Sequence, residues 1–355
     1  MSRELLDDAA ARARLDPGGM LTSVAALPDQ CREAWDAAEG IEPLSPEIEK
    51  VVVLGMGGSA IAGDIWRMLI ERESHIPIFN VRQYDLPPFV DECTLVIASS
   101  YSGNTEETLS AFEQALATRA KTFAITSGGK LLTVVRANGV PTFTYKFAGE
   151  PRAAIGWSLM PLLALSQRQG WMPDVDRDVS EAIAVMDALR SEIGPDVPAD
   201  RNEAKQLAQR LHEKLPIIYA GLPLTEVAHR WRSQLNESSK VWSFYDELPE
   251  LHHNAVVGFR LPEPIASSSI VVMLDSSDLM HRRVRMRYEF TRKQLASAGV
   301  ETAVVAAYGK SALAQMMSLI LIGDYVSTYL ALLYEVDPTP TGVIEELRDW
   351  LATQD

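Results

Sequence analysis

The segment from Val51 to Asp64, VVVLGMGGSAIAGD, constrains the fold of this chain more than any other part of it. Its first four residues form an unbroken apolar run, mostly β-branched, which is typical of a strand buried on both faces of a parallel sheet. The glycines that follow, including Gly57 and Gly58, allow the backbone to turn sharply and approach a ligand, and Ser59 opens a helical stretch. Such a turn at a helix N-terminus predicts an anion-binding site built from backbone N–H groups and the helix dipole.

A second segment repeats this order with hydroxyl groups in place of glycines. Thr94–Ala98 is another buried-type strand, and Ser100, Ser102 and Thr105 lie between it and the helical stretch EETLSAFEQAL. One interpretation is simple N-capping, because Thr105 precedes the acidic residues of a first helical turn. Three hydroxyls beside a glycine exceed what a cap requires, and two such turns in one sheet favour a phosphate-binding site.

Strand-like and helix-like segments alternate from residue 51 to 145, and the alternation begins again after residue 196. This pattern predicts an α/β protein with two tandem domains, each a parallel sheet flanked by helices, with ligands at the carboxyl ends of the strands. The stretch GPDVPADRN has the composition of an interdomain connection. The predicted parts are a helical extension (1–45), a first domain with the phosphate-binding loops (46–195), a second domain (196–336), and a tail with a last helix (337–355).

The pattern also predicts individual elements. These are two N-terminal helices broken at Asp16–Gly19, a turn at 127–130, one helix over 151–170 with loop-like chain from there to 195, a helix capped by Thr225, and a long helix from Ser311 to about Glu335.

Composition excludes some classes of function. The net charge of −15 argues against a nucleic-acid surface, which needs clustered Lys and Arg. An anionic substrate on so acidic a chain must be held by local donors, such as hydroxyls and helix N-termini, rather than by the overall field.

Features that the sequence lacks indicate the expected cellular location of the protein. Cys31 and Cys93 are the only cysteines, which is too few for a disulfide framework, and no His, Asp or Glu spacing resembles a metal site. The N-terminus lacks the apolar core of a signal peptide, and the apolar segment Met316–Leu333 contains Asp324 and falls short of a membrane span. The sequence therefore predicts a cytoplasmic protein with no metal and no membrane association.

Gly55-x-Gly57-x-x-Ala60 also matches the G-x-G-x-x-G/A fingerprint of dinucleotide-binding domains, so an NAD-dependent enzyme is an alternative. That site requires an acidic residue near the end of the next strand to bind the ribose hydroxyls. The segment PIFNVRQ offers Asn80 and Arg82 there and no carboxylate, although Arg82 is compatible with NADP. The hydroxyl cluster of the neighbouring loop fits a monophosphate better than a dinucleotide.

The segments GMGGSAIAGD, SYSGNTEET, EPRAAIGW, RWRSQLNESSK with DELPELHHNAVVG, and DPTPTGVIEELR follow one another over nearly the whole chain. In combination they resemble the bifunctional phosphoglucose/phosphomannose isomerases of the sugar isomerase (SIS) superfamily. The resemblance implies two SIS domains and a homodimer with a shared active site. It also implies a cofactor-free interconversion of glucose 6-phosphate or mannose 6-phosphate with fructose 6-phosphate, a reaction of carbohydrate metabolism.

The resemblance implies roles for individual residues. Residues at the family's phosphate-binding positions, beside the turn at Gly57 and Gly58, are Ser59, Ser100, Ser102 and Thr105. Glu237 would be the base that transfers the proton, and His253, from the neighbouring subunit, would open the sugar ring. Arg152 would stabilise the enediolate, and Thr341 would help to accept the mannose epimer.

The chain departs from the family pattern at three positions. Arg348 stands in the last helix where the family usually has Lys; it keeps the charge but does not readily exchange a proton, so a phosphate or hydroxyl contact is the role that survives. Ala255 replaces a common Glu after the histidine, and Ala60 replaces a Gly. Arg348 and Ala255 motivate an alternative function, a sugar-phosphate-binding regulatory or scaffolding protein that has lost catalysis.

The chemistry of isomerisation explains why these residue types are needed. A carboxylate of raised pKa suits proton transfer through a cis-enediol, whereas the alternative for Glu237 is a surface or capping residue. Imidazole can donate a proton to O5 and remove one from O1 near neutral pH. His252 and His253 cannot both point into one site from an extended backbone, so His252 is the expected bystander. Arg152 either pairs with Glu150 or stabilises an enediolate.

Overall fold

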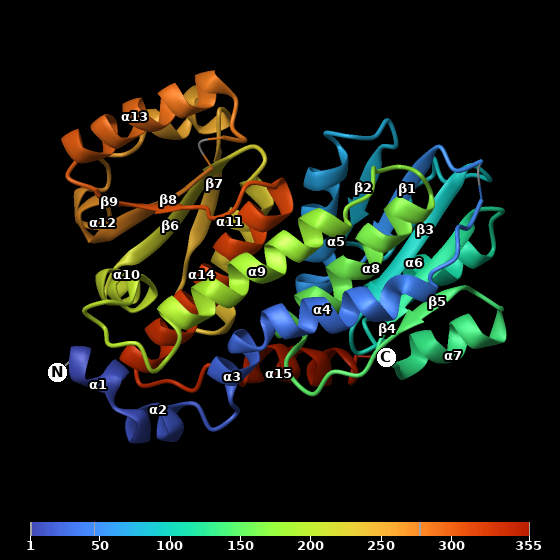
Figure 1. The fold of residues 1–355 in the computed structure, drawn as a ribbon, viewed down its shortest axis with the longest axis horizontal. Helices are drawn as coiled ribbons and strands as arrows, with labels where there is room; N and C mark the ends of the chain where they lie inside the picture. The colour runs from blue at the N-terminus through green and yellow to red at the C-terminus, as the bar shows by residue number, and fades with distance from the viewer. Residues whose placement is uncertain (1, 46, 277, 355) are drawn as a thin grey trace. The chain divides into compact units, whose positions relative to one another are not determined.

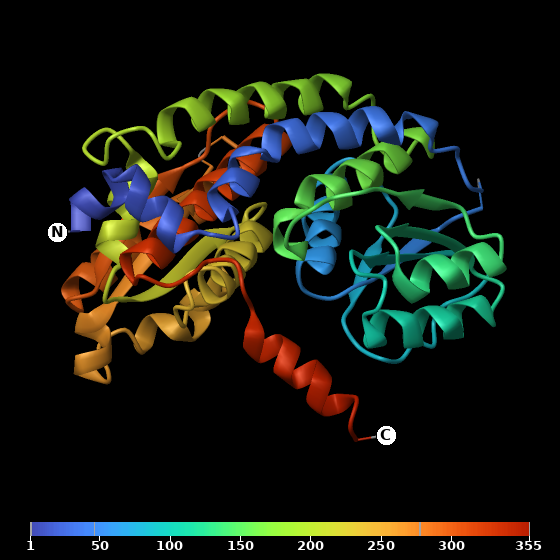
Figure 2. The ribbon, with the colours of Figure 1, turned by 90° about the horizontal axis from the view of Figure 1, so that it is seen from below.

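The computed structural model describes residues 2–45, 47–276 and 278–354 of the 355-residue chain. The chain forms two compact units. The first-sheet unit comprises Ala26–Met186 and Gly309–Gln315, and the second-sheet unit comprises Met1–Ala25, Asp187–Tyr308 and Met316–Asp355. Each unit contains a parallel sheet with helices on its faces (Figures 1 and 2), which confirms the predicted α/β architecture.

Within the described residues, the sheet of the first-sheet unit has five parallel strands in the order β2-β1-β3-β4-β5. The strands are β1 (Lys50–Leu54), β2 (Ile78–Val81), β3 (Thr94–Ser100), β4 (Lys121–Thr126) and β5 (Thr142–Thr144). The helices are α4 (Leu27–Ala37), α5 (Gly57–Ile70), α6 (Glu106–Leu116), α7 (Gly129–Ala137) and α8 (Ile155–Arg168), with the 3₁₀ turns η1 (Ala38–Gly40) and η2 (Pro151–Ala153).

The sheet of the second-sheet unit has the order β7-β6-β8-β9 over the part of the chain that the structure describes, and it is also parallel. The strands are β6 (Leu215–Gly221), β7 (Phe244–Leu248), β8 (Ser269–Asp275) and β9 (Glu301–Ala306). The helices are α1 (Ser2–Asp7), α2 (Ala9–Leu15), α3 (Met20–Ala25), α10 (Glu203–Leu211), α11 (Thr225–Glu237), α12 (Glu263–Ser268), α13 (Arg282–Ser297) and α15 (Gly342–Leu351), with η3 (Glu250–His253) and η4 (Ala255–Val257). The residues of α9 (Asp176–Ile193) and α14 (Ala312–Leu333) are divided between the two units.

Alternate residues of β1 pack against helices on opposite faces of the first sheet. Val52 and Leu54 belong to a buried cluster that includes Phe112 of α6 and residues of α7. On the other face, a Cβ on Gly63 of α5 would lie 3.0 Å from the side chain of Val53, so α5 packs closely on the strand. The strand predicted from its apolar run is therefore covered on both faces, as expected in a parallel sheet.

The direction of the chain through the first sheet reverses between β1 and β3. The chain leaves β1 through α5 to β2 on one side, and it leaves β3 through α6, β4 and α7 to β5 on the other. Helices α5 and α6 therefore lie on opposite faces of the sheet (Figure 1) and begin at the carboxyl ends of two adjacent strands. In open parallel sheets, ligands bind in the crevice at such a switch point.

The N-terminal region differs from the two helices predicted for residues 1–45. In the described residues it forms α1, α2, α3 and α4, of which the first three belong to the second-sheet unit and α4 to the first-sheet unit. The predicted break at Asp16 is confirmed. The Asp16 carboxylate accepts hydrogen bonds from the backbone N–H groups of Met20 (2.7 Å) and Leu21 (2.8 Å), and it thereby caps α3.

Residues 151–170 form η2 and α8 rather than one helix, because Ala154 between them departs from helical geometry (φ −94°, ψ 24°). The chain that was expected to be loop-like up to residue 195 contains the helix α9. Helix α7 and strand β7 have no counterpart among the predicted elements, since β7 is a mostly exposed edge strand without apolar alternation. The N-cap of α11 is Leu224, and Thr225 is the first residue of the helix instead of its cap.

Helix α14 is shorter than the predicted span of Ser311 to about Glu335 and is almost entirely apolar. By length and composition it is sufficient to cross a membrane, so the expectation that this segment falls short of a span is wrong. Its apolar window is wholly buried inside the protein, and the core helix of a globular protein meets the same criteria.

Candidate functional site

Helix α5 begins at Gly57, directly after β1. Gly57 has φ +49°, in the left-handed region that favours glycine, and no described side chain forms a capping hydrogen bond at this helix start. A Cβ on Gly57 would meet no atom within 4 Å, whereas a Cβ on Gly58 would lie 3.0 Å from the carbonyl oxygen of Pro151. The helix start is therefore open at Gly57 and packed against η2 at Gly58, so its first N–H groups can bind an anion.

Ser59 connects the glycine turn to the loop that follows β3. Its buried Oγ accepts a hydrogen bond from the backbone N–H of Tyr101 (3.1 Å), and Ser99 Oγ donates to the Ser59 carbonyl oxygen (3.3 Å). Since Ser59 Oγ accepts from an amide, its own proton can be donated to a further acceptor such as a phosphate oxygen. The two loops predicted from separate segments are thus joined at this residue.

The hydroxyls of the second loop lie at the start of α6. Thr105 occupies the N-cap position, but its Oγ1 lies 3.0 Å from Ser100 Oγ, and within the described chain no side chain makes a capping bond to α6. Ser100 Oγ also accepts from the backbone N–H of Gly103 (3.1 Å), and Ser102 Oγ accepts from that of Asn104 (3.2 Å). Simple capping therefore does not account for Thr105, and a second uncapped helix N-terminus faces the same crevice as the first.

A neighbouring turn supports this loop. Gly103 has φ +64°, and a Cβ there would lie 1.9 Å from the carbonyl oxygen of Gly128, which only glycine tolerates. The Asn104 carboxamide oxygen accepts from the backbone N–H of Lys130 (3.0 Å), at the start of α7. The turn predicted at 127–130 covers only residues 127 and 128, because α7 begins at Gly129, and this helix start contacts the hydroxyl loop.

Arg152 lies in η2 beside the glycine turn. Its side chain is buried and pairs with the Glu150 carboxylate at 3.2 Å, which is the structural role weighed for it from the sequence. A Cβ on Gly58 would lie 3.1 Å from the Cα of Arg152, so the backbone of η2 contacts the start of α5. A guanidinium carries five donors in a fixed fork geometry that suits carboxylate and phosphate oxygens, which is the chemistry that the predicted role of Arg152 requires.

Two residues that were not predicted hold this region together. Gln30 of α4 accepts a hydrogen bond from the Gly156 N–H (2.7 Å) and donates one to the Ala153 carbonyl (2.9 Å), which fixes the junction of η2 and α8. The Tyr101 hydroxyl lies 2.8 Å from the carbonyl oxygens of Phe147 and Gly149, just before Arg152. Tyr101 lies within the hydroxyl-rich segment that the sequence had indicated, whereas nothing local distinguishes Gln30.

The dinucleotide alternative depended on Arg82 at the end of β2. In the structure Arg82 forms an ion pair and hydrogen bond with the buried Asp64 of α5. This pairing engages the cation that an NADP-type site would use, and it disfavours the alternative.

The other predicted residues lie in the second-sheet unit. Glu237 is the last residue of α11 and is half-buried, which distinguishes it from a freely solvated surface glutamate. Lys240 Nζ donates to the Glu237 carbonyl oxygen (2.6 Å), and the positive φ of Lys240 (+57°) turns the chain after the helix. The buried Ser239 donates to the Ser327 carbonyl of α14 (2.6 Å), so the end of α11 is held against α14.

His252 and His253 lie in the 3₁₀ turn η3, not on the extended backbone that was expected. Arg287 Nη1 lies 2.9 Å from His252 Nδ1 and must donate to it, so Nε2 carries the proton and donates to Thr291 Oγ1 (2.8 Å). Burial, followed by the charge of Arg287, lowers the pKa of His252. Both ring nitrogens of His252 are engaged, whereas His253 is exposed, in agreement with a bystander role for His252.

Thr341 and Arg348 belong to the C-terminal element. Thr341 is the N-cap residue of α15 and is half-buried, and Arg348 is exposed. No side chain within α15 is buried, although Leu347 and Trp350 are apolar, and the helix projects from the rest of its unit (Figure 2).

The switch point of the second sheet, between β6 and β8, is filled by the protein itself. The Tyr288 hydroxyl of α13 accepts from the Gly221 N–H (2.9 Å) and donates to the Leu274 carbonyl (2.7 Å). A Cβ on Gly221 would lie 2.5 Å from the Val284 side chain. The Tyr288 hydroxyl thus links the carboxyl ends of β6 and β8 at the switch point of the second sheet.

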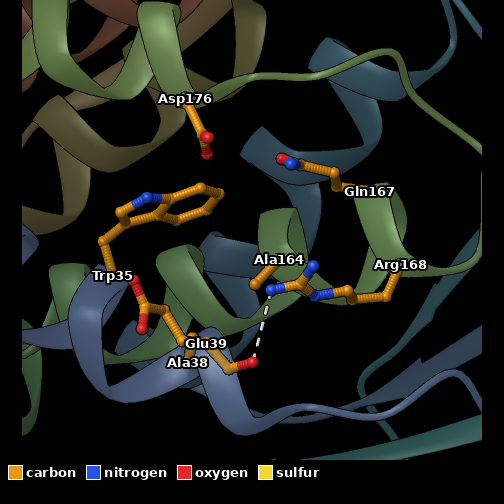
Figure 3. Close-up of a pocket in the computed structure, with 7 residues that line it drawn as sticks. All are labelled: Trp35, Ala38, Glu39, Ala164, Gln167, Arg168 and Asp176. Carbon is orange, nitrogen blue, oxygen red and sulfur yellow. Dashed lines mark hydrogen bonds between the residues drawn. The ribbon is translucent and has the colours of Figure 1, made fainter.

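A separate pocket of about 130 Å³ lies in the first-sheet unit between α4, α8 and α9 (Figure 3). Its lining includes Trp35, Gln167, Arg168 and Asp176, and Arg168 donates to the Glu39 carbonyl oxygen (3.3 Å). The predicted site residues are not among those that line it in the described structure, so this pocket is distinct from the phosphate site.

Comparison with known proteins agrees with this arrangement. The family model described as the bacterial phospho-glucose isomerase C-terminal SIS domain matches residues 200–351. The bifunctional phosphoglucose/phosphomannose isomerase of Caldicellulosiruptor bescii is 43% identical over 339 residues, which cover 94% of this chain and 99% of that relative. The protein of the same name from Aquifex aeolicus is 37% identical over 303 residues, covering 85% and 90%. The crystal structure of a hypothetical protein from Thermus thermophilus has the same fold, with a TM-score of 0.77 and 19% identity, over 99% of this chain and 94% of that one.

Proposed function

The chain belongs to the bifunctional phosphoglucose/phosphomannose isomerase family, and from that premise we propose its substrate and the residues that carry its reaction. It is a ketol-isomerase that interconverts glucose 6-phosphate and mannose 6-phosphate with fructose 6-phosphate. The observation that carries the proposal is the meeting of two uncapped helix N-termini, α5 and α6, with the hydroxyls of Ser59, Ser100 and Thr105 at the switch point of the first sheet.

The phosphate binds to the N–H groups and hydroxyls at this switch point. The residues that hold it are Gly57, Gly58, Ser59, Ser100, Ser102 and Thr105. Each helix N-terminus stabilises an anion by about 0.3–1 kcal/mol at an exposed site and up to about 2 kcal/mol in a partly buried one. Local donors of this kind are needed because a chain of net charge −15 repels an anionic substrate overall.

The reaction begins with ring opening. His253, supplied by the partner subunit, donates a proton to O5 and removes one from O1, which gives the open-chain aldose. Glu237 then removes the proton from C2 and returns it to C1, so that the reaction passes through a cis-enediol and the carboxylate regains its starting form. Arg152 stabilises the negative charge on the enediolate oxygens.

The C-terminal helix completes the site. Arg348 contacts the phosphate or a sugar hydroxyl, since its guanidinium does not exchange a proton readily. Thr341 helps the site to accept mannose 6-phosphate, the C2 epimer of glucose 6-phosphate. Both aldoses therefore serve as substrates. The half-buried position of Thr341 and the exposure of Arg348 support a contact made with a bound ligand.

A homodimer with a shared active site, in the cytoplasm, is the proposed form of the enzyme. The exposure of His253 supports its use by a neighbouring subunit. Trp242, Val257 and Leu261 of the same unit are apolar and exposed, and exposed apolar side chains support the presence of a subunit interface.

A coupled assay on EDTA-treated protein tests the proposal. Both glucose 6-phosphate and mannose 6-phosphate are expected to yield fructose 6-phosphate, at the same rate as in untreated protein. Protein that is thermally stabilised by fructose 6-phosphate but converts neither aldose would be a binding protein, the alternative that Arg348 and Ala255 suggested, and would overturn the proposal.

A further inference from the structure

Helix α14 contains one charged residue, Asp324, in an otherwise uncharged run, ALAQMMSLILIGDYVSTYLALL. The Asp324 side chain is 5% exposed. A buried carboxylate is costly unless it is paired and hydrogen-bonded, so its presence in such a helix calls for a specific role.

Both carboxylate oxygens of Asp324 bind side chains of α11. Arg230 Nη2 donates to Oδ2 (2.7 Å) and Gln234 Nε2 donates to Oδ1 (2.8 Å), and both partners are almost fully buried. These contacts define the rotation of α11 about its axis and its position along α14, because each oxygen is matched to a donor one turn apart.

The face of α11 that binds Asp324 also carries Glu237. At about 100° per residue, position 237 lies about 20° from position 230 around the helix, and position 234 about 40° from it on the other side. Glu237 therefore lies on this face, one turn beyond Gln234. A change in the register of α11 against α14 would move the Glu237 carboxylate directly.

Other contacts keep the two helices close. Trp231 Nε1 donates to the Leu319 carbonyl oxygen (2.8 Å), and a Cβ on Gly323 would lie 2.5 Å from the Trp231 ring, so only glycine permits this approach. Close packing sets the distance between the helices, and the Asp324 hydrogen bonds set which residues face each other.

We propose that Asp324 is a positioning residue: by binding Arg230 and Gln234 it fixes the register of α11 and so places the Glu237 carboxylate for proton transfer. This inference rests on the proposed role of Glu237. Buried ion pairs add little to stability relative to apolar packing, and fixing a register is the best attested of their uses. A displacement of about 1 Å at a catalytic group lowers a rate by about 100-fold.

The test compares Asp324→Asn with Thr328→Val in the full-length enzyme. Asp324→Asn keeps the shape of the side chain and removes its charge. It is expected to lower kcat by about 10- to 100-fold and to change KM for fructose 6-phosphate by less than about twofold. Thr328 bonds the Asp324 carbonyl within α14 (2.8 Å) and is equally buried, so Thr328→Val is the matched control and should keep the wild-type kcat.

Two further variants cover the case in which Asp324→Asn does not fold. Arg230→Met with Asp324→Leu removes both charges and keeps apolar volume, and Gln234→Met removes one donor and leaves the ion pair. Both are expected to fold and to lower kcat at nearly constant KM. If every folded variant keeps kcat within twofold of the wild type, Asp324 has a structural role only and the inference is overturned.

Glu237→Gln, measured in the same assay, separates this inference from the proposed function. An inactive Glu237→Gln with fully active Asp324 and Gln234 variants overturns the positioning role alone. An active Glu237→Gln shows that Glu237 is not the base, and inactive wild-type protein overturns the proposed function itself.

Discussion

At the scale of single residues, the proposed phosphate site contains hydroxyls whose oxygens accept hydrogen bonds from the backbone. Ser59 accepts from Tyr101 and keeps a proton to donate, and Ser100 accepts from Gly103 and shares a hydrogen bond with Thr105, so one hydroxyl of that pair keeps a proton to donate. The residues are therefore oriented before a ligand binds, and little entropy is lost when it does.

Substitution of Ser59 tests this arrangement. Ser59→Ala removes one donor to the phosphate and the link to Tyr101, and a hydrogen bond to a charged group contributes about 1.5–3 kcal/mol. KM for all three hexose phosphates is expected to rise by about 10-fold or more, with a smaller change in kcat. Ser110→Ala is the control, because Ser110 lies on α6 and donates to the Tyr84 carbonyl (3.0 Å), outside the site. An unchanged KM in Ser59→Ala would place the phosphate elsewhere.

His252 gives a prediction for the pH dependence of stability. Burial, followed by the charge of Arg287, lowers its pKa in the folded protein. As the pH falls below about 6.5, the unfolded chain takes up a proton that the folded protein resists, so the free energy of unfolding decreases until the folded pKa is passed. Above the unfolded pKa this destabilisation is absent.

His252→Gln removes this titration, and its Tm should fall less between pH 7 and pH 5 than that of the wild type. Parallel curves for His252→Gln and wild type would show that His252 does not titrate differently in the two states.

At the scale of elements, the site arises where two helices begin beside each other at the carboxyl ends of β1 and β3. The proposed phosphate site lies at this position of the first sheet, whereas in the second sheet Tyr288 of α13 binds the backbone at the equivalent position. The close approach of α13 to Gly221 accompanies this contact, since a Cβ on Gly221 would lie 2.5 Å from the Val284 side chain.

Gly103→Ala tests how the hydroxyl loop depends on its support. Both Gly103 and Gly139 have φ +64°, but a Cβ on Gly103 would lie 1.9 Å from the Gly128 carbonyl oxygen, whereas a Cβ on Gly139 would meet nothing within 4 Å. Gly139→Ala should therefore lower the free energy of unfolding by only about 1 kcal/mol, the cost of placing a residue with a Cβ at positive φ. Gly103→Ala should lower the free energy of unfolding by more than this, and it should also raise KM for the hexose phosphates. Equal losses without a change in KM would contradict a role for this contact.

The elements that the sequence predicted well are those whose signal is local. The apolar run from Val51 to Leu54 and the segment Thr94–Ala98 needed only their own residues to indicate buried strands, and both are strands in the structure. The position of the two helix starts at one edge of the sheet followed, because parallel strands bring their carboxyl ends to the same edge. Strand β7 was missed because its exposed edge position requires no apolar pattern.

Contacts between distant residues could not be predicted in this way. Gln30 holds the junction before α8 from 126 positions away, and Tyr288 closes the second switch point across 67 positions. The break in the helix predicted over 151–170 has the same cause, since the Gln30 contact replaces a local helical turn near Arg152. The chain departs from its predicted helical structure at this point, which lies next to the proposed site.

At the scale of the whole molecule, the proposed reaction combines residues of both units and of two subunits. Ser59, Ser100 and Arg152 belong to the first-sheet unit, and Glu237 and His253 belong to the second-sheet unit. In this proposal the phosphate contacts come from the first-sheet unit, and the base and the ring-opening histidine come from the second-sheet unit.

Mixing two inactive variants tests the shared active site. Glu237→Gln and His253→Asn should each be inactive as homodimers, while a mixed dimer has one site with both changes and one site with neither. If His253 acts in the partner's site, unfolding and refolding the mixture should restore about a quarter of the wild-type activity, since half of the dimers that form are mixed. A mixture that stays inactive after refolding would place Glu237 and His253 of one subunit in the same site.

The central claim is that Glu237 moves hydrogen between C2 and C1 of a sugar whose phosphate is bound at the first sheet. Incubating wild-type and Glu237→Gln protein with fructose 6-phosphate in D₂O, and following deuterium incorporation into the sugar by NMR, tests it most directly. The wild type should exchange the hydrogen at C1, and Glu237→Gln should lose exchange by about 100-fold or more while fructose 6-phosphate still raises its Tm. Exchange by Glu237→Gln at the wild-type rate would contradict the account.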